Sequence, residues 1–269
     1  MGEQIGRDLA GFLHELADAA DQAVLPYFRG ANAVSNKLDE GFDPVTEADR
    51  GAERAIRAII DERYPEHGIY GEEFGHKKPT SDAAPTWVLD PVDGTRAFIT
   101  GMLNWMTLIG LTGKEGAYAG LASQAFTRER FFADGNDGAS WYRGPGGETK
   151  KLAVSEVTEL NEAKFCTTVP ELFTGPLEAF FEKMLEITPV KRFSGDAYFY
   201  CMLAAGQIDV IVEPRLEAYD IAALIPIIEN AGGVITKLDG TSAHDGGDVV
   251  ATATPQLHDA VLNLLATTS

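Results

Sequence analysis

The residues best suited to chemistry are two aspartates at the end of an apolar run, in the segment Asp90-Pro-Val-Asp-Gly-Thr95. The run from Trp87 to Leu89 is typical of a buried strand, which would deliver both carboxylates to its end. Because Pro91 restricts the backbone on either side of it, covalent geometry keeps the carboxylates close together. Two neighbouring carboxylates favour a hard cation such as Mg²⁺ or Mn²⁺. The alternative is an Asx turn that closes the strand.

The residues that follow Asp93 predict a phosphate site. Gly94 and Thr95 open a short segment, Arg96 to Ile99, that can start a helix. Small residues at such a position let backbone N–H groups approach an anion closely. A phosphate bound there would be bridged to metal ions held by the two aspartates.

Three further acids lie where they could converge on this segment. Glu72 follows a short strand predicted from His67 to Tyr70, and its alternative is a solvated loop acid. Glu213 ends a predicted strand, and its alternative is an exposed surface acid. Asp220 begins a predicted helix, where aspartate is also a preferred N-cap residue. Taken alone, none of the three decides between a site and a structural role.

The composition excludes polyanionic partners. A formal net charge of −19 in 269 residues opposes association with nucleic acid or an anionic membrane surface, so an anionic substrate must be small and met by metal. No stretch approaches the ~20 apolar residues of a membrane span, and the first residues lack the basic start of a signal peptide. We therefore expect a cytoplasmic protein. Cys166 and Cys201 are expected to be reduced core residues.

Periodicity in the first half of the chain predicts helices followed by an antiparallel sheet. Apolar residues between Ile5 and Phe28 recur at helical spacing, and a polar, flexible stretch, Gly30 to Gly41, follows. Thr46 to Asp49 matches a capping box that opens a second helix. Strands separated by glycine turns are predicted from Trp87 to Asp134. The irregular stretch Gly135 to Gly147 is predicted to be an interdomain connection or an exposed excursion.

The second half alternates strands with helices, which indicates an α/β layer. Pro226 lies past the first turn of one predicted helix and should kink it. We expect two domains, an α+β domain over 1–145 with most metal ligands and an α/β domain over 146–269 that completes the active site. The predicted strands cover 164–168, 190–193, 208–213 and 249–251, and the predicted helices cover 175–186, 196–205, 220–231 and 255–265.

Several segments together resemble the inositol monophosphatase superfamily of metal-dependent, lithium-sensitive phosphatases. They are Pro44-Val-Thr-Glu-Ala-Asp49, Gly71-Glu-Glu73, the segment from Asp90 to Thr95, and Ala218-Tyr-Asp-Ile-Ala-Ala223 with Glu229-Asn-Ala-Gly-Gly233. They occur in the family's order over most of the chain. The resemblance implies an α+β fold, specifically a layered α-β-α-β-α sandwich of the sugar-phosphatase type. It also implies a homodimer that hydrolyses a small phosphate monoester.

The resemblance further implies roles for individual residues. Asp49, Thr95 and Glu72 would be catalytic, with Asp49 and Thr95 orienting the attacking water, and Gly94 and Thr95 would hold the phosphate. Two or three Mg²⁺ ions would bind, Mn²⁺ would substitute, and Li⁺ would inhibit. Divalent ions suit this reaction because they generate hydroxide from water and neutralise charge on the reacting oxygens. The implied metal ligands are Glu72, Asp90, the Val92 carbonyl, Asp93 and Asp220.

Within the superfamily, the segments 41–50, 93–101, 192–200 and 219–226 resemble the histidinol-phosphatase branch more than the inositol branch. Histidinol phosphate carries an ammonium and an imidazole, so its leaving group favours acidic partners. Asp196 and Glu213 would supply them, although Asp196 is also a candidate N-cap. Arg192 would contact phosphate or a partner subunit, or else lie on the surface. The expected substrate-binding residues are Gly94, Thr95, Arg192, Gly195, Asp196, Ala197, Glu213 and Asp220.

Some residues depart from the branch pattern. Ala197 stands where a cysteine is expected, and Leu103-Asn104 replaces the usual Pro-Leu. Ala218 and Asn230 also differ, and no departure affects an implied metal ligand. Two other hypotheses therefore stay open: an inositol or related sugar or nucleotide monophosphatase of the same fold, and a noncatalytic metal-dependent binding protein. The second is disfavoured because all the implied ligands are present.

Overall fold

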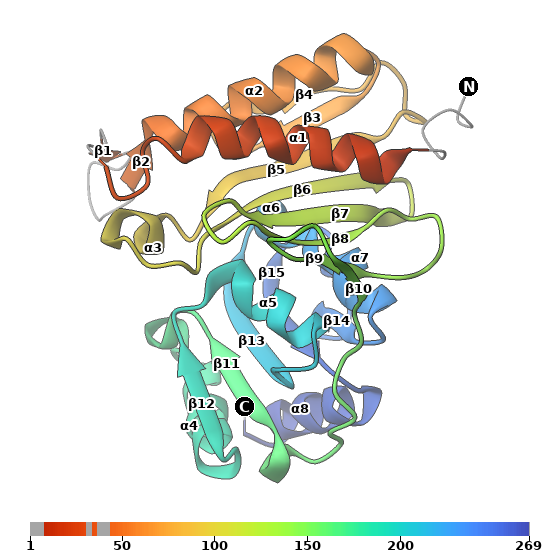
Figure 1. Ribbon diagram of the computed structural model, residues 1–269. Helices are drawn as coiled ribbons and strands as arrows, with labels where there is room; N and C mark the ends of the chain where they lie inside the picture. The colour runs from red at the N-terminus through yellow and green to blue at the C-terminus, as the bar shows by residue number, and fades with distance from the viewer. Residues whose placement is uncertain (1–7, 31–33, 37–43, 269) are drawn as a thin grey trace.

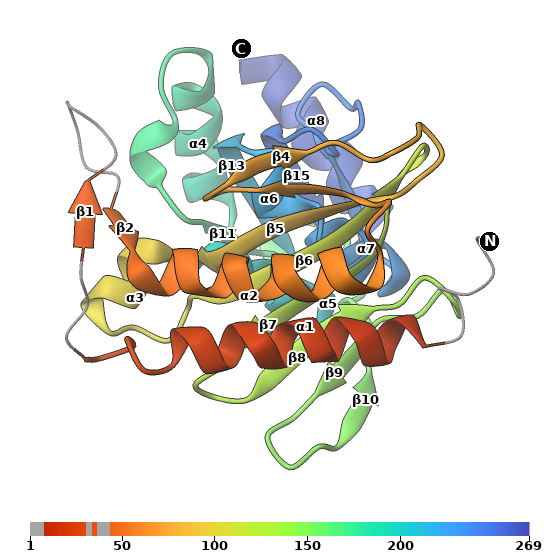
Figure 2. The same cartoon turned by 90° about the horizontal axis from the view of Figure 1, so that it is seen from above.

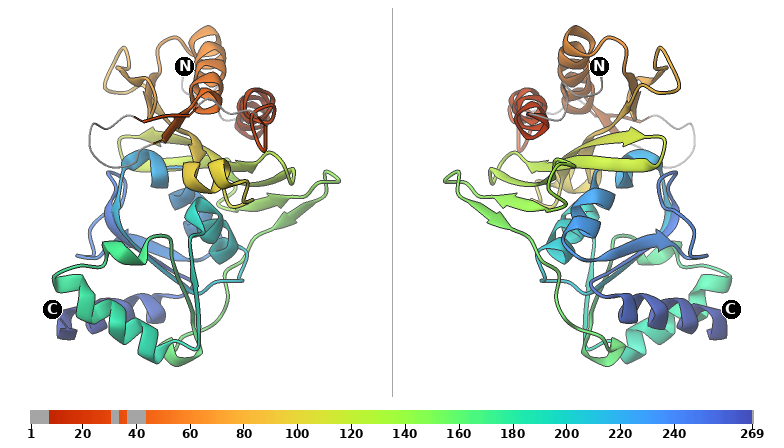
Figure 3. Two further views of the ribbon diagram at one scale, coloured as in Figure 1. Left: turned by 90° about the vertical axis from the view of Figure 1, so that its left-hand side faces the viewer. Right: turned by 90° about the vertical axis from the view of Figure 1, so that its right-hand side faces the viewer.

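The computed structural model describes residues 8–30, 34–36 and 44–268, which form alternating layers of helices and sheets (Figure 1). Two helices cover one face of a large sheet, a group of short helices fills the space between that sheet and a smaller one, and two more helices cover the far side (Figure 3). The predicted α-β-α-β-α sandwich is confirmed. None of the helices in the described ranges combines the length and the apolar character that a membrane span requires.

The outer layer consists of α1 (Leu9–Val24) and α2 (Glu47–Arg63), which lie side by side on the large sheet (Figure 2). Helix α1 is shorter than predicted, because turns follow it up to Gly30, and Ile5 lies outside the described residues. Most of the stretch from Gly30 to Gly41 is also outside them. The short strands β1 (Val34–Asn36) and β2 (Pro44–Thr46) pair with each other.

The large sheet has eight strands in the order β10-β9-β8-β7-β6-β5-β3-β4 and is antiparallel except for the parallel pair β3 and β5. This confirms the predicted antiparallel character. Part of Gly135 to Gly147 belongs to the sheet as β9, so an interpretation of that whole stretch as irregular was wrong. The proposed division into two domains stays a prediction. The strands are β3 (Gly68–Gly71), β4 (Gly75–Lys77), β5 (Thr86–Asp93), β6 (Met106–Gly113), β7 (Gly116–Gln124), β8 (Glu129–Ala133), β9 (Trp141–Arg143) and β10 (Thr149–Lys151).

The smaller sheet has five strands in the order β12-β11-β13-β15-β14. Strand β11 pairs in parallel with both of its neighbours, whereas β15 is antiparallel to β13 and β14. The helices α4 (Pro176–Ile187) and α8 (Pro255–Thr268) cover its outer face (Figure 1). Strand β14 was not predicted. The strands are β11 (Lys164–Thr167), β12 (Val190–Phe193), β13 (Val210–Leu216), β14 (Val234–Lys237) and β15 (Gly247–Thr252).

Between the sheets lie α5 (Asp196–Ala204), α6 (Ala218–Ile221) and α7 (Leu224–Asn230). The prediction of one helix from Asp220 to Ala231, kinked at Pro226, was wrong. The chain breaks between α6 and α7, and Pro226 is the third residue of α7, where its missing N–H costs no helical hydrogen bond. The break fits against paired glycines of β6 and β7: a Cβ on Gly120 would lie 2.1 Å from the carbonyl oxygen of Ala223.

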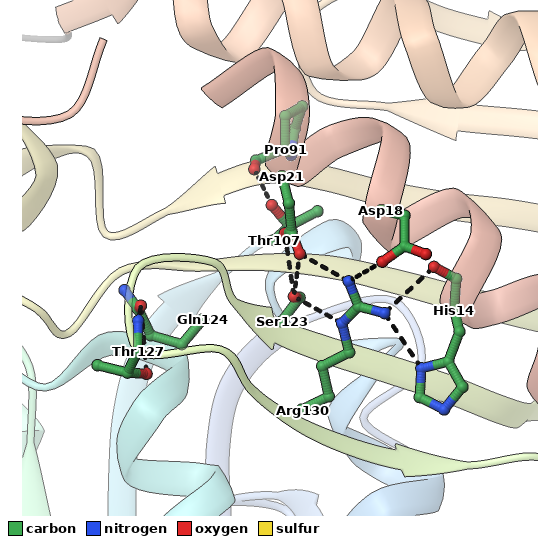
Figure 4. Close-up of polar contacts among 9 residues, drawn as sticks. All are labelled: His14, Asp18, Asp21, Pro91, Thr107, Ser123, Gln124, Thr127 and Arg130. Atoms are coloured by element: carbon green, nitrogen blue, oxygen red, sulfur yellow. Dashed lines mark hydrogen bonds and ion pairs between the residues drawn. The ribbon is translucent and has the colours of Figure 1, made fainter. Parts of the chain in front are cut away.

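A polar network fixes α1 to the large sheet (Figure 4). The Arg130 guanidinium on β8 donates to Asp18 and Asp21 of α1 at 2.5 and 2.7 Å, and Ser123 of β7 donates to Asp21 at 3.0 Å. Burial and the neighbouring Arg130 charge lower the pKa of His14 to about 4. These groups satisfy one another, so we assign the network a structural role. Cys166 and Cys201 are buried and free, as predicted.

Candidate functional site

The two aspartates of the opening motif lie at an irregularity of β5. The pairing register between β5 and β6 shifts between Asp90 and Asp93. The Pro91 carbonyl at this shift accepts a hydrogen bond from the Thr107 hydroxyl at 2.7 Å (Figure 4). The Val92 N–H donates to Asp90 Oδ1 at 3.1 Å. The strand therefore ends in a turn that these two hydrogen bonds hold, and this turn presents both carboxylates.

Asp220 joins the two aspartates from α6, which packs against β5. The carboxylates of Asp90, Asp93 and Asp220 each offer an oxygen, and these oxygens lie within 4.8 Å of one another. The N-cap of α6 is Glu217, so the alternative reading of Asp220 as an N-cap was wrong. Asp220 is instead the third residue of the helix, and its Oδ2 accepts the Glu217 N–H at 2.7 Å in a capping box.

Burial and mutual repulsion make this acidic cluster unfavourable without a cation. Burial, followed by the charges of Glu72 and Asp93, raises the pKa of Asp90 well above its ordinary value. Burial raises the pKa of Asp220 to about 7. A bound divalent ion would reverse both effects. Only carboxylates make up the cluster, and such a donor set fits a hard cation rather than Zn²⁺.

Glu72 and Asp49 lie within electrostatic reach of the cluster. Glu72 follows β3, and its N–H donates to the Leu89 carbonyl of β5 at 3.2 Å. Asp49 is 2% exposed on α2, and its charge also raises the pKa of Asp90. Their assigned roles as metal ligand and water-orienting residue stay predictions.

Glu53 positions the turn after Glu72, and the sequence analysis missed it. Its carboxylate is fully buried and accepts the N–H groups of Glu73 and Phe74 at 2.8 and 3.2 Å. Arg57, one helical turn further along α2, donates to it at 2.7 Å. Gly71 is required beside it, because a Cβ there would lie 2.0 Å from Glu53 Oε1. The spacing of Asp49 and Glu53, which places both on one face of α2, was the available signal.

We expect Glu53→Gln to weaken divalent-cation binding about 10- to 100-fold, because partners that orient metal ligands have effects of this size. The loss of charge opposite Arg57 should cost about 1–3 kcal/mol of unfolding free energy. Titration calorimetry with Mg²⁺ measures the first effect and denaturant unfolding the second. Glu62→Gln, an exposed change on the same helix, is the matched control. Unchanged cation affinity in Glu53→Gln would contradict the positioning role.

The expected phosphate-binding residues follow the aspartates directly. Gly94 adopts a left-handed conformation at φ 80° and precedes α3 (Thr95–Thr100). The Thr95 hydroxyl donates to the Val92 carbonyl at 3.1 Å, and this carbonyl has a second lone pair available to a cation. The structure thus groups Val92, Gly94 and Thr95 at the end of β5, and their functional assignments remain predictions.

A cavity of about 230 Å³ adjoins the acidic cluster. Asp93, Asp220 and Glu213 are among the residues that line it. Glu213 is 6% exposed and lies inside β13, so its alternative reading as a surface acid was wrong. Burial raises the pKa of Glu213 to about 8. Thr168, which sequence reasoning missed, donates to Glu213 Oε1 through its hydroxyl at 2.6 Å and through its N–H at 2.9 Å.

Asp196 completes the acidic lining of this cavity. It is the first residue of α5, with Gly195 as the N-cap, and its N–H donates to the Thr168 hydroxyl at 3.0 Å. Burial raises the pKa of Asp196 to about 6, while a hydrogen bond from Asn104 acts in the opposite direction. The next N–H, from Ala197, donates to Asp93 Oδ2 at 2.6 Å. Cavity and cluster are therefore parts of one hydrogen-bonded unit.

Two further residues, one on β12 and one on α5, differ from each other in their relation to the cavity. Arg192 is exposed on β12 and is not among the residues that line the cavity, which agrees with its alternative reading as a surface residue; a contact with phosphate or with a partner subunit stays a prediction. Tyr200 does line the cavity, and among the described residues its buried hydroxyl has no hydrogen-bond partner. Helical spacing from Asp196 was the only signal in the sequence that could have indicated Tyr200.

The layered fold, together with carboxylates that converge from both sheets on one cavity, defines a class of cation-dependent hydrolases. Comparison with protein families matches residues 7–268 to the inositol monophosphatase family. The chain belongs to this family and is therefore a metal-dependent phosphatase.

Individual relatives agree with this classification. The chain is 35% identical over 260 residues to a histidinol-phosphatase of Streptomyces coelicolor, and the match covers 94% of each protein. It is 37% identical over 230 residues to the chloroplastic bifunctional phosphatase IMPL2 of Arabidopsis thaliana; the match covers 84% of this chain but 63% of the plant protein. A solved inositol monophosphatase from Zymomonas mobilis superimposes with a TM-score of 0.83 at 34% identity, over 96% of this chain and 98% of that one.

Proposed function

We propose that the protein is an Mg²⁺-dependent histidinol-phosphate phosphatase, which converts L-histidinol phosphate and water into L-histidinol and phosphate. The observation that carries this proposal is the pair of acids, half-buried Asp196 and buried Glu213, in the cavity beside the acidic cluster. Desolvated carboxylates favour a cationic partner, and the leaving group of histidinol phosphate carries an ammonium and an imidazole. The Streptomyces relative, named a histidinol-phosphatase, supports the same substrate.

In this proposal the metal ions would be held by Glu72, Asp90, the Val92 carbonyl, Asp93 and Asp220. Bound divalent ions would lower the pKa of water and offset negative charge on the phosphate. Thr95 and Asp49 orient a water whose oxygen forms the new bond to phosphorus. The bond from phosphorus to the alcohol oxygen breaks, and a proton ends on that oxygen.

The second candidate is an inositol monophosphatase, which the similarity to the Zymomonas structure favours. A neutral polyol gains less from the two acids of the cavity than a cationic alcohol does. Substrate preference therefore separates the two candidates.

We expect kcat/KM for L-histidinol phosphate to exceed that for myo-inositol 1-phosphate by about a hundredfold or more, because an ionic partner discriminates more strongly than shape. Glu213→Gln should lower kcat/KM for L-histidinol phosphate about 10- to 100-fold. It should change kcat/KM for the inositol ester by less than about threefold. Phosphate release on both esters and on 3′-phosphoadenosine nucleotides measures this. Glu178→Gln, exposed on α4, is the control. Equal turnover of all esters by the unmodified enzyme would reject histidinol phosphate as its substrate.

A further inference from the structure

Asn104, in the segment between α3 and β6, forms a clamp on the turn that presents Asp196. Its side-chain amide donates to the Ser194 carbonyl at 2.6 Å and to Asp196 Oδ2 at 3.2 Å. One side chain therefore holds both the backbone before Gly195 and the carboxylate after it. Asp196 also lines the cavity beside the acidic cluster.

The turn that Asn104 holds is conformationally strained. Ser194 and Asp196 have φ values of 63° and 45°, in the left-handed region that residues with a side chain rarely adopt. Such conformations persist only where surrounding contacts impose them. The Ser194 N–H donates to the carbonyls of Thr167 and Thr168 at 3.2 and 3.1 Å, so β11 fixes one side of the turn and Asn104 the other.

Asn104 is itself held in place from the large sheet. The buried Gln124 side chain at the end of β7 donates to the Leu103 and Trp105 carbonyls, at 3.0 and 3.1 Å. Gln124 in turn accepts the Thr127 N–H at 2.9 Å (Figure 4). The backbone on both sides of Asn104 is therefore anchored, and its amide can act as a rigid donor.

The contact also places the Asp196 carboxylate next to the acidic cluster. A Cβ on Gly94 would lie 3.2 Å from Asp196 Cγ and 2.9 Å from the Asn104 carbonyl oxygen. Glycine at this position thus lets the carboxylate lie beside the residue that follows Asp93. Rotation of Asp196 away from Asn104 would change the distance between its charge and the leaving group.

We propose that Asn104 is a positioning residue for substrate specificity: it fixes the Asp196 carboxylate to receive the cationic part of the leaving group. Asn104 acts through Asp196 and the strained turn. The inference rests on the proposed function for the identity of that cation, whereas the clamp rests on the contacts alone. The two parts can therefore be tested separately.

Asn104→Leu removes the donor at similar size, and Asn104→Asp retains the shape without the amide donor. For both variants we expect KM for L-histidinol phosphate to rise about tenfold, the loss typical of one hydrogen bond to a charged group. kcat for myo-inositol 1-phosphate should stay within about twofold, since that ester does not use the Asp196 charge. Amide hydrogen exchange at Asp196 should become faster, because its bond to Thr168 depends on the held turn.

Asn136→Leu, exposed in the turn after β8, is the control and should change neither KM nor exchange. Unchanged exchange at Asp196 in both Asn104 variants would overturn the clamp, whatever the substrate. Faster exchange with an equal KM increase for both esters would overturn the specificity role. If the unmodified enzyme shows no preference for histidinol phosphate, the proposed function fails, while the exchange measurement still decides the clamp.

Discussion

Asp93→Asn is expected to lower kcat/KM by on the order of a thousandfold, while the fold is retained. The change removes one anion from the three carboxylates whose oxygens lie within 4.8 Å of one another. Asparagine has the same shape, and its side-chain oxygen can still accept the Ala197 N–H. Burial and the charge of Asp196 raise the pKa of Asp93, so a neutral residue relieves repulsion. The metal-free variant should therefore melt at the same temperature as the unmodified protein or higher.

Steady-state phosphate release and thermal unfolding without added metal are the two measurements. Asp82→Asn is the matched control, because Asp82 is exposed in the segment before β5. Retained turnover in Asp93→Asn would exclude its role as a metal ligand. A large loss of thermal stability, in contrast, would show that the carboxylate is needed for the fold.

Metal removal is expected to abolish activity and to make stability fall with pH. Burial raises the pKa of Asp220 to about 7 and that of Glu213 to about 8. Between pH 6.5 and 8.5 the folded, metal-free protein therefore binds more protons than the unfolded chain. Its stability is highest at the lower end of this window and is lost as pH rises through the folded-state values. The pKa of His14 is lowered to about 4, so the folded-state protonation of this residue changes below this pH window.

The check is a series of melting curves from pH 6.5 to 8.5 after chelation, with and without Mg²⁺. We expect the melting temperature of the chelated protein to fall by several degrees across the series. Mg²⁺ at 100 times its dissociation constant should add about 2.7 kcal/mol to the free energy of unfolding. In a chain of this size, each kcal/mol corresponds to a rise of roughly 2–4 °C in melting temperature. A chelated protein whose stability rises with pH, or that keeps full activity, would contradict the metal assignment.

Local signals were sufficient where sequence-adjacent residues determine the structure. The apolar run that ends in Asp90 and Asp93 predicted β5 and its paired acids, because strand pattern and proline geometry act over a few residues. The same holds for α5, predicted from Asp196 to Ala205 and observed from Asp196 to Ala204.

The features that were not predicted from the sequence depend on tertiary contacts. The break between α6 and α7 follows from the close approach of Ala223 to Gly110 and Gly120, which no helical pattern encodes. Asn104 and Thr168 gain their roles only through contacts with residues distant in the chain. For Asn104, the only hint was its departure from the pattern of the histidinol-phosphatase branch.

The helix break on the glycine pair also bears on how the enzyme folds. Docking of α6 and α7 onto β6 and β7 brings Asp220 to the end of β5, and the Ala197–Asp93 hydrogen bond closes a span of 104 residues. Contacts of such long range form only after the entropy of closing a large loop has been overcome. We therefore expect the cation site to form late, after both sheets have formed. A nascent or truncated chain that ends before α6 would fold its large sheet without the complete carboxylate cluster, so metal uptake would report the completion of folding.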